Sequence, residues 1–383
     1  MYIFVITFLL LYGGMHFYAY LKVCNAFMLR FYSKCVLSLW MVIMTISPFI
    51  VRTAEHLWVK PALYFAWPSF IWMGFIFIFA SVLLISDIFY CCYRLVARYV
   101  LKFLPCNFST PTASRIALFL SATICAYAFF EADRFQTEHV VIRSPKIQTQ
   151  DSKIRIVQIS DVHIGLLMRE KRLKKVIEII KEAKPDIVVS TGDLIDGRLN
   201  KDAAMIFGVN PLAALMASIP APSGKFAAVG NHEIYAGLAQ SLEFTKAAGF
   251  TTLQDKSIIL KNGITITGFD DRSVNQITPP VAEKEMNLIN KVSKDSFHLL
   301  LKHRPDILPQ SDGSFDLQLS GHVHNGQIFP FNYLVKYVHP IPCGTTRTIN
   351  GSQIHVSRGT GTWGPPMRLL APPEVTIIDL IPL

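Results

Sequence analysis

The ten residues IRIVQISDVH, at positions 154–163, decide the fold, because a β-branched run ends there in the polar pair Asp161-x-His163. Such a run, bounded by polar residues, is typical of a buried strand. Helical spacing follows over residues 172–183, and the next apolar run covers residues 187–191. Strands that alternate with helices in this way predict an α/β layered domain.

The same alternation continues toward the end of the chain. The pattern predicts further helices near residues 203–218 and 238–248. Apolar runs predict further strands at residues 225–229, 264–267, 298–301, 317–319, 354–356 and 375–380. We therefore expect one α/β domain over residues 136–383.

Polar clusters with metal-ligating side chains follow the predicted strands. They are Asp161-Val162-His163, Gly192-Asp193 with Asp196, Gly230-Asn231-His232-Glu233, His303, and Gly321-His322-Val323-His324. Each cluster alone has an ordinary structural explanation, such as a turn that caps a helix. Side chains at the carboxyl ends of parallel strands, however, converge on one crevice in α/β sheets. All five clusters in this order therefore predict a shared metal site.

The chemistry of this donor set favours phosphoryl transfer. Two divalent ions about 3.5–4 Å apart can activate one water and neutralise charge on the attacking and leaving oxygens of a phosphoester. Imidazole and carboxylate ligands suit manganese, zinc or iron. The clusters contain no cysteine, which argues against a structural zinc site. We expect two divalent metal ions, with their identity left open.

At these clusters the sequence resembles the calcineurin-like metallophosphoesterases. It is most similar to the bacterial membrane-associated subgroup with N-terminal transmembrane helices, through residues 320–327, 359–366 and 371–374. The resemblance implies a four-layer α/β/β/α metallophosphoesterase sandwich, here preceded by a four-helix transmembrane domain. It also implies a metal-dependent phosphoric ester hydrolase.

The resemblance further implies a role for each residue. The ligands of one metal ion would be Asp161, His163 and His324, those of the other would be Asn231, His303 and His322, and Asp193 would bridge the two. His232 would contact the phosphate and act as the general acid. A metal-bound hydroxide would be the nucleophile. Asp196 is expected to support a turn or another side chain and not to bind metal.

Two residues depart from the family pattern without removing a ligand. Arg304 follows His303 where a smaller or polar residue is more usual, and Asn325 follows the His-x-His where glycine is more usual. Arg304 could bind substrate phosphate, and a solvated side chain is the ordinary alternative.

The first 135 residues have a different composition from the rest. The whole chain is 51% hydrophobic with a net charge of +10, yet residues 1–135 contain only four acidic side chains. A helix needs about 20 mostly apolar residues to cross a bilayer. Four stretches qualify, at residues 1–21, 35–51, 65–85 and 116–130. We expect a transmembrane domain over residues 1–135 and a catalytic domain over residues 136–383.

Loop charges predict the orientation of these spans. Lysine and arginine are concentrated in the loops 22–34 and 87–115, which the positive-inside rule places in the cytoplasm. The catalytic domain would then lie on the outer, periplasmic face of the plasma (inner) membrane. The soluble part has no basic run of the kind that binds nucleic acid, so no nucleic-acid partner is expected.

Apolar residues around the last cluster suggest the substrate. They are Ile328, Phe329, Phe331, Tyr333, Leu334, Val335 and Tyr337, followed by Met367, Leu369 and Leu370. We expect them to rim the site and touch lipid, so that the substrate is a phospholipid headgroup or a lipid-linked phosphate. The alternative is that they pack inside the protein. A nucleotide phosphodiesterase or nuclease on the same scaffold, and a non-catalytic membrane sensor, are the other function classes.

Overall fold

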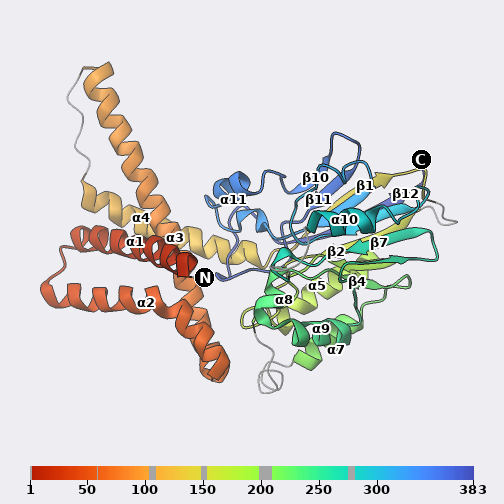
Figure 1. The fold of residues 1–383 in the computed structure, drawn as a ribbon. Coiled ribbons are helices and arrows are strands. Elements are labelled where there is room, and N and C mark those ends of the chain that lie inside the picture. The colour runs from red at the N-terminus through yellow and green to blue at the C-terminus, as the bar shows by residue number, and fades with distance from the viewer. Residues whose placement is uncertain (1, 58, 103–108, 148–152, 198–208, 275–280) are drawn as a thin grey trace. The chain divides into compact units, whose positions relative to one another are not determined.

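The computed structural model describes the chain apart from residues 1, 58, 103–108, 148–152, 198–208 and 275–280 (Figure 1). It divides into two compact units. A helical unit contains Met1–Phe130 with Gly364–Met367, and a mixed α/β unit contains Glu131–Trp363 with Arg368–Leu383. The domain boundary expected near residue 135 stays a prediction.

Long helices make up the described part of the helical unit. They are α1 (Tyr2–Ala26), α2 (Phe31–Leu57), α3 (Val59–Leu95), the short π-helix η1 (Val96–Val100) and α4 (Thr110–Ala132), whose last two residues belong to the other unit. Among the described residues, three segments are long and apolar enough to cross a membrane: Phe31–Glu55, Pro61–Val100 and Thr110–Ala132. This supports membrane association. The expected count of four spans is not confirmed, because α1, which contains the first expected span, is not among the three.

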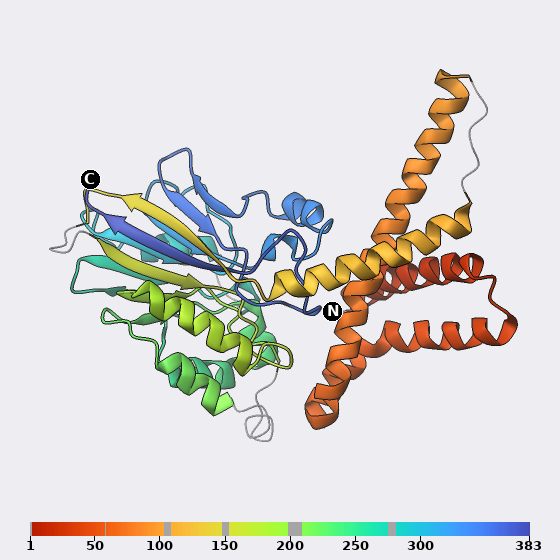
Figure 2. The same cartoon turned by 180° about the vertical axis from the view of Figure 1, so that it is seen from behind.

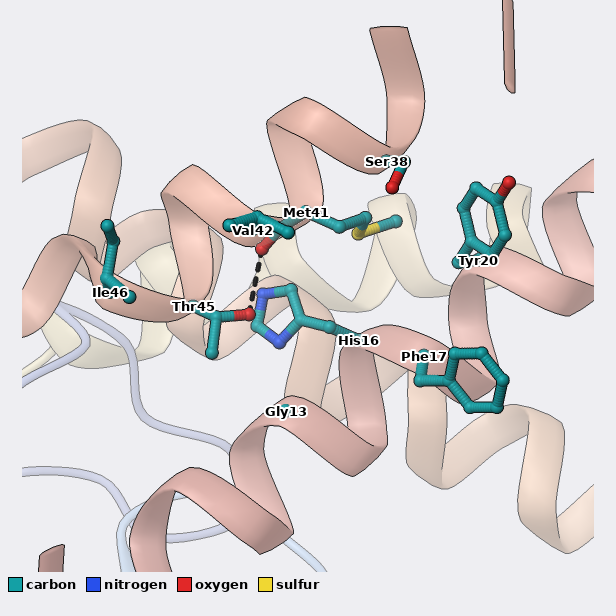
Figure 3. A pocket seen from close by; sticks show the side chains of 9 residues that line it. All are labelled: Gly13, His16, Phe17, Tyr20, Ser38, Met41, Val42, Thr45 and Ile46. Atoms are coloured by element: carbon teal, nitrogen blue, oxygen red, sulfur yellow. Dashed lines mark hydrogen bonds between the residues drawn. The ribbon is translucent and has the colours of Figure 1, made fainter. Parts of the chain in front are cut away.

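Polar contacts join the helices of this unit. His16 donates from Nδ1 to the carbonyl of Tyr12 (2.8 Å) and accepts at Nε2 from the indole of Trp72 (2.9 Å), which fixes a neutral ring. Asp87 pairs with Lys22 at 2.6 Å. His16 also lines a cavity of about 350 Å³ between α1 and α2, which is shown in Figure 3.

Two six-stranded sheets form the centre of the α/β unit. The first has the order β1-β12-β2-β3-β4-β5 and the second the order β10-β11-β9-β8-β7-β6. The strands of the first sheet are β1 (Gln136–Arg143), β12 (Glu374–Ile381), β2 (Ile154–Ile159), β3 (Ile187–Ser190), β4 (Lys225–Ala227) and β5 (Thr251–Thr252). Those of the second are β10 (Gly344–Arg347), β11 (Gln353–Val356), β9 (Leu317–Ser320), β8 (Phe297–Leu301), β7 (Ile264–Gly268) and β6 (Lys256–Ile259).

Alternating side chains place the first sheet between two apolar cores. In β2, Ile156 belongs to the core between the sheets, with residues such as Leu299 and Leu317. Its neighbour Val157 points to the opposite face and packs with the helices. Those helices are α5 (Glu170–Ala183), α7 (Val209–Ala217), α8 (Asn231–Ala236) and α9 (Leu238–Ala247) (Figure 2).

Helix α10 (Val281–Ile289) covers the second sheet, where Ile289 joins a core with Leu300. The layers are therefore α/β/β/α, and this predicted fold class is confirmed. The predicted helix at residues 203–218 begins outside the described residues, and α7 accounts for its second half. The sequence analysis missed β1, β5, β6 and β10, because edge or partly exposed strands lack a continuous apolar run.

Candidate metal centre and active site

Parallel strands bring the predicted site residues to one edge of the α/β unit. β2, β3 and β4 are parallel to one another and precede Asp161, Asp193 and Asn231, while β8 and β9 are parallel and precede His303 and His322. Backbone hydrogen bonds tie the loops together. The Asp161 N–H donates to the carbonyl of Gly192 (3.0 Å), and the His163 N–H donates to that of Asp193 (3.0 Å).

The backbone of these loops is left-handed at five of the predicted metal ligands. The φ angles are 52° at Asp161, 53° at His163, 52° at Asp193, 72° at His322 and 47° at His324. A non-glycine residue in this conformation costs about 1–2 kcal/mol. Such strain is typical of functional sites, where the surrounding structure holds the backbone in place.

The first cluster consists of Asp161, His163 and His324, all buried. His324 Nε2 lies 3.3 Å from the Asp161 carboxylate and 3.1 Å from His163 Nε2. Asp161 is held by the hydroxyl of Ser160 (2.5 Å) and by the backbone N–H of His322 (3.0 Å). These contacts aim a carboxylate and two imidazoles at one point.

The second cluster consists of Asp193, His303 and His322. His303 Nδ1 lies 2.9 Å from the carbonyl of Thr191, which fixes the proton on that nitrogen and leaves Nε2 free to bind metal. Nε2 lies 3.1 Å from the Asp193 carboxylate and 3.1 Å from His322 Nδ1. Asp193 also belongs to a third group with His163 and His232, so it lies between the two clusters, as a bridging ligand would.

The donor atoms of both clusters fit divalent cations. Buried Asn231 Oδ1 and His163 Nδ1 have no hydrogen-bond partner, and the first of these is a predicted ligand atom. Burial, together with neighbouring histidines, lowers the pKa of His163 and of His322 to about 3, so both rings keep a lone pair at neutral pH. Against the effect of burial, Asp193 and then Asp161 raise the pKa of His303 to about 10. The site therefore attracts positive charge strongly.

Glu233 shapes the loop that carries Asp193, a role that the sequence analysis did not assign. Its buried carboxylate accepts backbone N–H bonds from Asp193 (2.9 Å), Leu194 (2.6 Å), Ile195 (3.2 Å) and Gly230 (2.8 Å). Burial and the Asp193 charge raise the pKa of Glu233 to about 7. Gly230 is required because a Cβ there would lie 2.2 Å from Asp193 Oδ1.

His232, the predicted general acid, faces this centre. Its backbone N–H donates to Asp193 Oδ1 (2.8 Å), and its Nδ1 lies 3.0 Å from Asp196 Oδ1. Asp196 thus orients the imidazole, which agrees with its expected supporting role. With Nδ1 engaged, Nε2 is the nitrogen able to exchange a proton with a substrate.

Arg304 and Asn325, the two departures from the family pattern, have structural explanations. The Arg304 guanidinium donates to Asp271 (2.7 Å) and lies 3.1 Å from His322 Nε2, so it belongs to the wall of the site. Its contact with substrate stays a prediction. Asn325 has a φ of 50°, a left-handed conformation that asparagine adopts more readily than most residues. It can therefore replace the usual glycine.

Arg368 is a further site residue that the sequence analysis missed. Its side chain is fully buried and donates to the carbonyls of Gly361 (2.6 Å), Arg358 (2.7 Å) and Ala371 (3.1 Å). It also lies 3.1 Å from His324 Nδ1. No sequence motif marks it, because its partners are mostly backbone carbonyls.

The apolar residues near the site differ in exposure, and Phe329, Val335 and Leu369 are half-buried. Ile328 and Met367 are buried, so the expectation that they touch lipid is wrong for these two residues. The exposed ones are Phe331, Tyr333, Leu334, Tyr337 and Leu370. All of these except Leu370 lie in or beside helix α11 (Asn332–Val338), which has no buried residue.

Comparison with known proteins identifies the family. The model of the calcineurin-like phosphoesterases matches residues 154–326. A protein of Aquifex aeolicus, named as an uncharacterized metallophosphoesterase, is 36% identical over 264 residues, which cover 69% of this chain and 98% of that protein. A Helicobacter pylori protein with the same description is 31% identical over 61% of each chain.

A Danio rerio protein, named as a transmembrane protein with metallophosphoesterase domain, is 26% identical over 69% of this chain and 62% of its own length. The chain thus spans nearly all of the Aquifex protein and about three fifths of the other two. Metallophosphoesterases typically use two divalent metal ions, and the clusters described above could hold them. The chain belongs to the calcineurin-like metallophosphoesterase family and is a metal-dependent phosphoester hydrolase.

Proposed function

We propose that this chain is a multi-pass membrane enzyme that hydrolyses the phosphoester of a lipid headgroup or of a lipid-linked phosphate. The observation that carries the proposal is the exposed apolar surface of α11, which directly precedes a residue of the site wall. His339 follows the helix, and its ring centroid lies 5.3 Å from that of His322. Lysine and arginine are concentrated in loops 22–34 and 87–115. The positive-inside rule places such loops in the cytoplasm, which supports a catalytic domain on the outer, periplasmic face.

The surface of α11 has the composition of a membrane-interface segment. Tyr333 is 65% exposed, Leu334 53% and Tyr337 87%, and Lys336 is the one charged residue of the helix. Tyrosine is enriched at the level of lipid headgroups, where its ring is buried and its hydroxyl is hydrated. A lysine at that level can bind an anionic headgroup while its stem covers apolar surface. Lipid thereby comes within reach of the site wall.

The ligand set assigned from the family resemblance is part of the proposal. Asp161, His163 and His324 would hold one divalent ion, and Asn231, His303 and His322 the other, with Asp193 shared between them. The ions would supply Lewis acidity toward the phosphate and activation of a water. His232, oriented by Asp196, would protonate the leaving oxygen. Arg304, a fixed cation beside His322, would bind a phosphate oxygen.

The first experiment measures hydrolysis by the detergent-solubilised full chain with manganese, zinc, iron or magnesium. The substrates are bis-nitrophenyl phosphate, nitrophenyl phosphate and a phospholipid panel. We expect metal-dependent turnover that Asp193→Ala abolishes with every substrate and that His232→Ala abolishes with the phospholipids. A protein that binds no metal would contradict the proposed mechanism.

The second experiment separates lipid contact from chemistry. Tyr333→Glu combined with Leu334→Glu should reduce hydrolysis of phospholipid in vesicles at least tenfold and leave turnover of bis-nitrophenyl phosphate unchanged. Ile349→Glu is the matched control, because Ile349 is 99% exposed in the turn between β10 and β11. Equal loss of both activities in the double variant would contradict a lipid-binding role for α11.

A further inference from the structure

We propose that Trp363 is an apolar contact surface for the leaving group beside His232, so that the apolar part of the substrate is attached to the leaving oxygen. The phosphate and its other substituents then face Arg304. This inference rests on the proposed function, because it requires that His232 protonates the leaving oxygen. It goes further by assigning the orientation of the substrate.

Trp363 has an exposed side chain and a backbone held by hydrogen bonds. Its ring centroid lies 5.7 Å from that of His232, at an interplanar angle of 74°, and 49% of its surface is exposed. Gln327 fixes its backbone with two hydrogen bonds, donating to the Trp363 carbonyl (2.9 Å) and accepting from its N–H (2.8 Å). A tryptophan side chain has only two rotatable bonds, so on this fixed backbone it presents a large apolar surface at a low cost in conformational entropy on binding.

The segment before Trp363 is joined to the metal-binding loops. The Thr360 N–H donates to the carbonyl of Ser160 (2.7 Å), and the Gly361 N–H donates to that of Asp161 (2.9 Å). A Cβ on Gly361 would lie 2.1 Å from the carbonyl oxygen of Val162, so only glycine permits this approach. The position of the tryptophan is therefore set by the same loop that presents Asp161.

The other neighbours of His232 and of the second cluster are more polar. Tyr235, whose ring centroid lies 5.6 Å from that of His232, carries a phenolic hydroxyl that can donate or accept a hydrogen bond. Arg304 and His339 both approach His322. The surroundings of the site thus change from the apolar ring of Trp363 to the guanidinium of Arg304, a cation that is paired with Asp271. An anionic phosphate matches the cationic side, and an alkyl or aryl group matches the tryptophan.

The direction of proton transfer then assigns the leaving group. A water oxygen bonds to phosphorus, the bond from phosphorus to the leaving oxygen breaks, and His232 gives a proton to that oxygen. His232 regains a proton from the water, so the products are an alcohol and a phosphate with one fewer ester bond. The substituent on the leaving oxygen must lie against the ring neighbours of His232. The apolar product is therefore released as the alcohol.

The test uses two series of isomeric phosphonate esters in detergent, without vesicles. In one, an alkyl chain is placed on the leaving group, as in 2-alkyl-4-nitrophenyl methylphosphonates. In the other it is placed on phosphorus and cannot leave, as in 4-nitrophenyl alkylphosphonates. We expect kcat/KM to rise with chain length in the first series, by up to about fourfold per buried methylene, and to stay flat in the second.

Variants assign this gain to the tryptophan. Trp363→Ala should abolish the dependence on chain length in the first series, and Trp363→Phe should retain most of it. Metal content of both variants should equal that of the native protein. A gain confined to the second series, in which the alkyl chain is on phosphorus, or a gain that persists in Trp363→Ala, would overturn the inference while leaving the phosphoesterase intact. If the protein turns over none of these substrates and no bis-nitrophenyl phosphate either, the proposed function would instead be overturned.

Discussion

The Arg368 guanidinium lies 3.1 Å from Nδ1 of His324, the ring nitrogen opposite the one that faces Asp161. The outer nitrogens of metal-binding histidines are usually hydrogen-bonded, as Nδ1 of His303 is to the carbonyl of Thr191. Arg368 thus fixes both the orientation of His324 and the segment from Arg358 to Ala371, whose carbonyls it binds.

Arg368→Met should destabilise the protein and weaken the first metal site. Several buried carbonyls would lose their donor, and each costs about 1–3 kcal/mol. We expect a loss of at least about 3 kcal/mol in the free energy of unfolding and a fall from two bound metal ions toward one. Thermal unfolding and elemental analysis measure these quantities. Arg272→Met, at a side chain 58% exposed, is the control and should change neither.

His322→Gly should be more stable than His322→Ala, although both lose a proposed metal ligand. At a φ of 72°, alanine carries a strain of about 1 kcal/mol that glycine does not. Thermal unfolding of the metal-free variants measures the difference. The same pair at His298, which lies in strand β8, should show the reverse order, because glycine weakens an extended strand. Alanine being the more stable at both positions would show that the left-handed backbone carries no strain.

Asp196→Asn should reduce activity most with substrates whose leaving group must be protonated by a general acid. The variant loses the carboxylate 3.0 Å from His232 Nδ1 and so weakens the orientation of the imidazole. We expect a loss of about tenfold or more with alkyl esters and a much smaller one with nitrophenyl esters, whose leaving group needs little protonation. His232→Ala should show the same dependence more strongly. A uniform loss with all esters would indicate a structural role for Asp196.

Asp379 should make stability depend on pH below about pH 4. Hydrogen bonds from Arg155 and Lys153 lower the pKa of this carboxyl from 3.8 to about 2. A depressed carboxyl pKa stabilises the folded state above the unfolded value, and the contribution is lost as the pH falls through the folded value. Asp379→Asn should therefore cost about 1 kcal/mol at pH 7, allowing for solvent screening. The difference in melting temperature between Asp379→Asn and the native protein should become smaller as the pH is lowered from 4 to 3. A constant difference would show that the ion pair does not stabilise the fold.

Some site residues can be predicted from the sequence, namely those whose position in the fold is determined by the local sequence pattern. Asp161 and His322 follow buried apolar runs, and parallel strands place such residues at one edge, so their convergence could be anticipated. Glu233 and Arg368 could not be assigned in this way. Their partners are backbone groups of remote loops, and the backbone carries no residue-specific signal in the sequence.

The same limit applies to the fold. The strands with continuous apolar runs, such as β3 and β8, were predicted, because both of their faces are buried. β1 alternates between partly buried and exposed residues, and its place in the sheet depends on a partner about 240 residues away. The apolar residues from Ile328 to Tyr337 were expected to rim the site as loops, and four of them, Tyr333, Leu334, Val335 and Tyr337, lie in helix α11.

The position of β12 in the first sheet determines when the sheet can be completed during synthesis of the chain. β12 pairs with β1 on one side and with β2 on the other, so two strands that are close in sequence are separated by one synthesised much later. The ribosome must pass Ile381 before β1 has a neighbour in the sheet. Contacts this distant in sequence make folding slow. A nascent chain interrupted before residue 374 therefore has an incomplete sheet and exposes the apolar surface that Ile377 and Ile378 would cover, and such exposed surface makes a chain prone to aggregation.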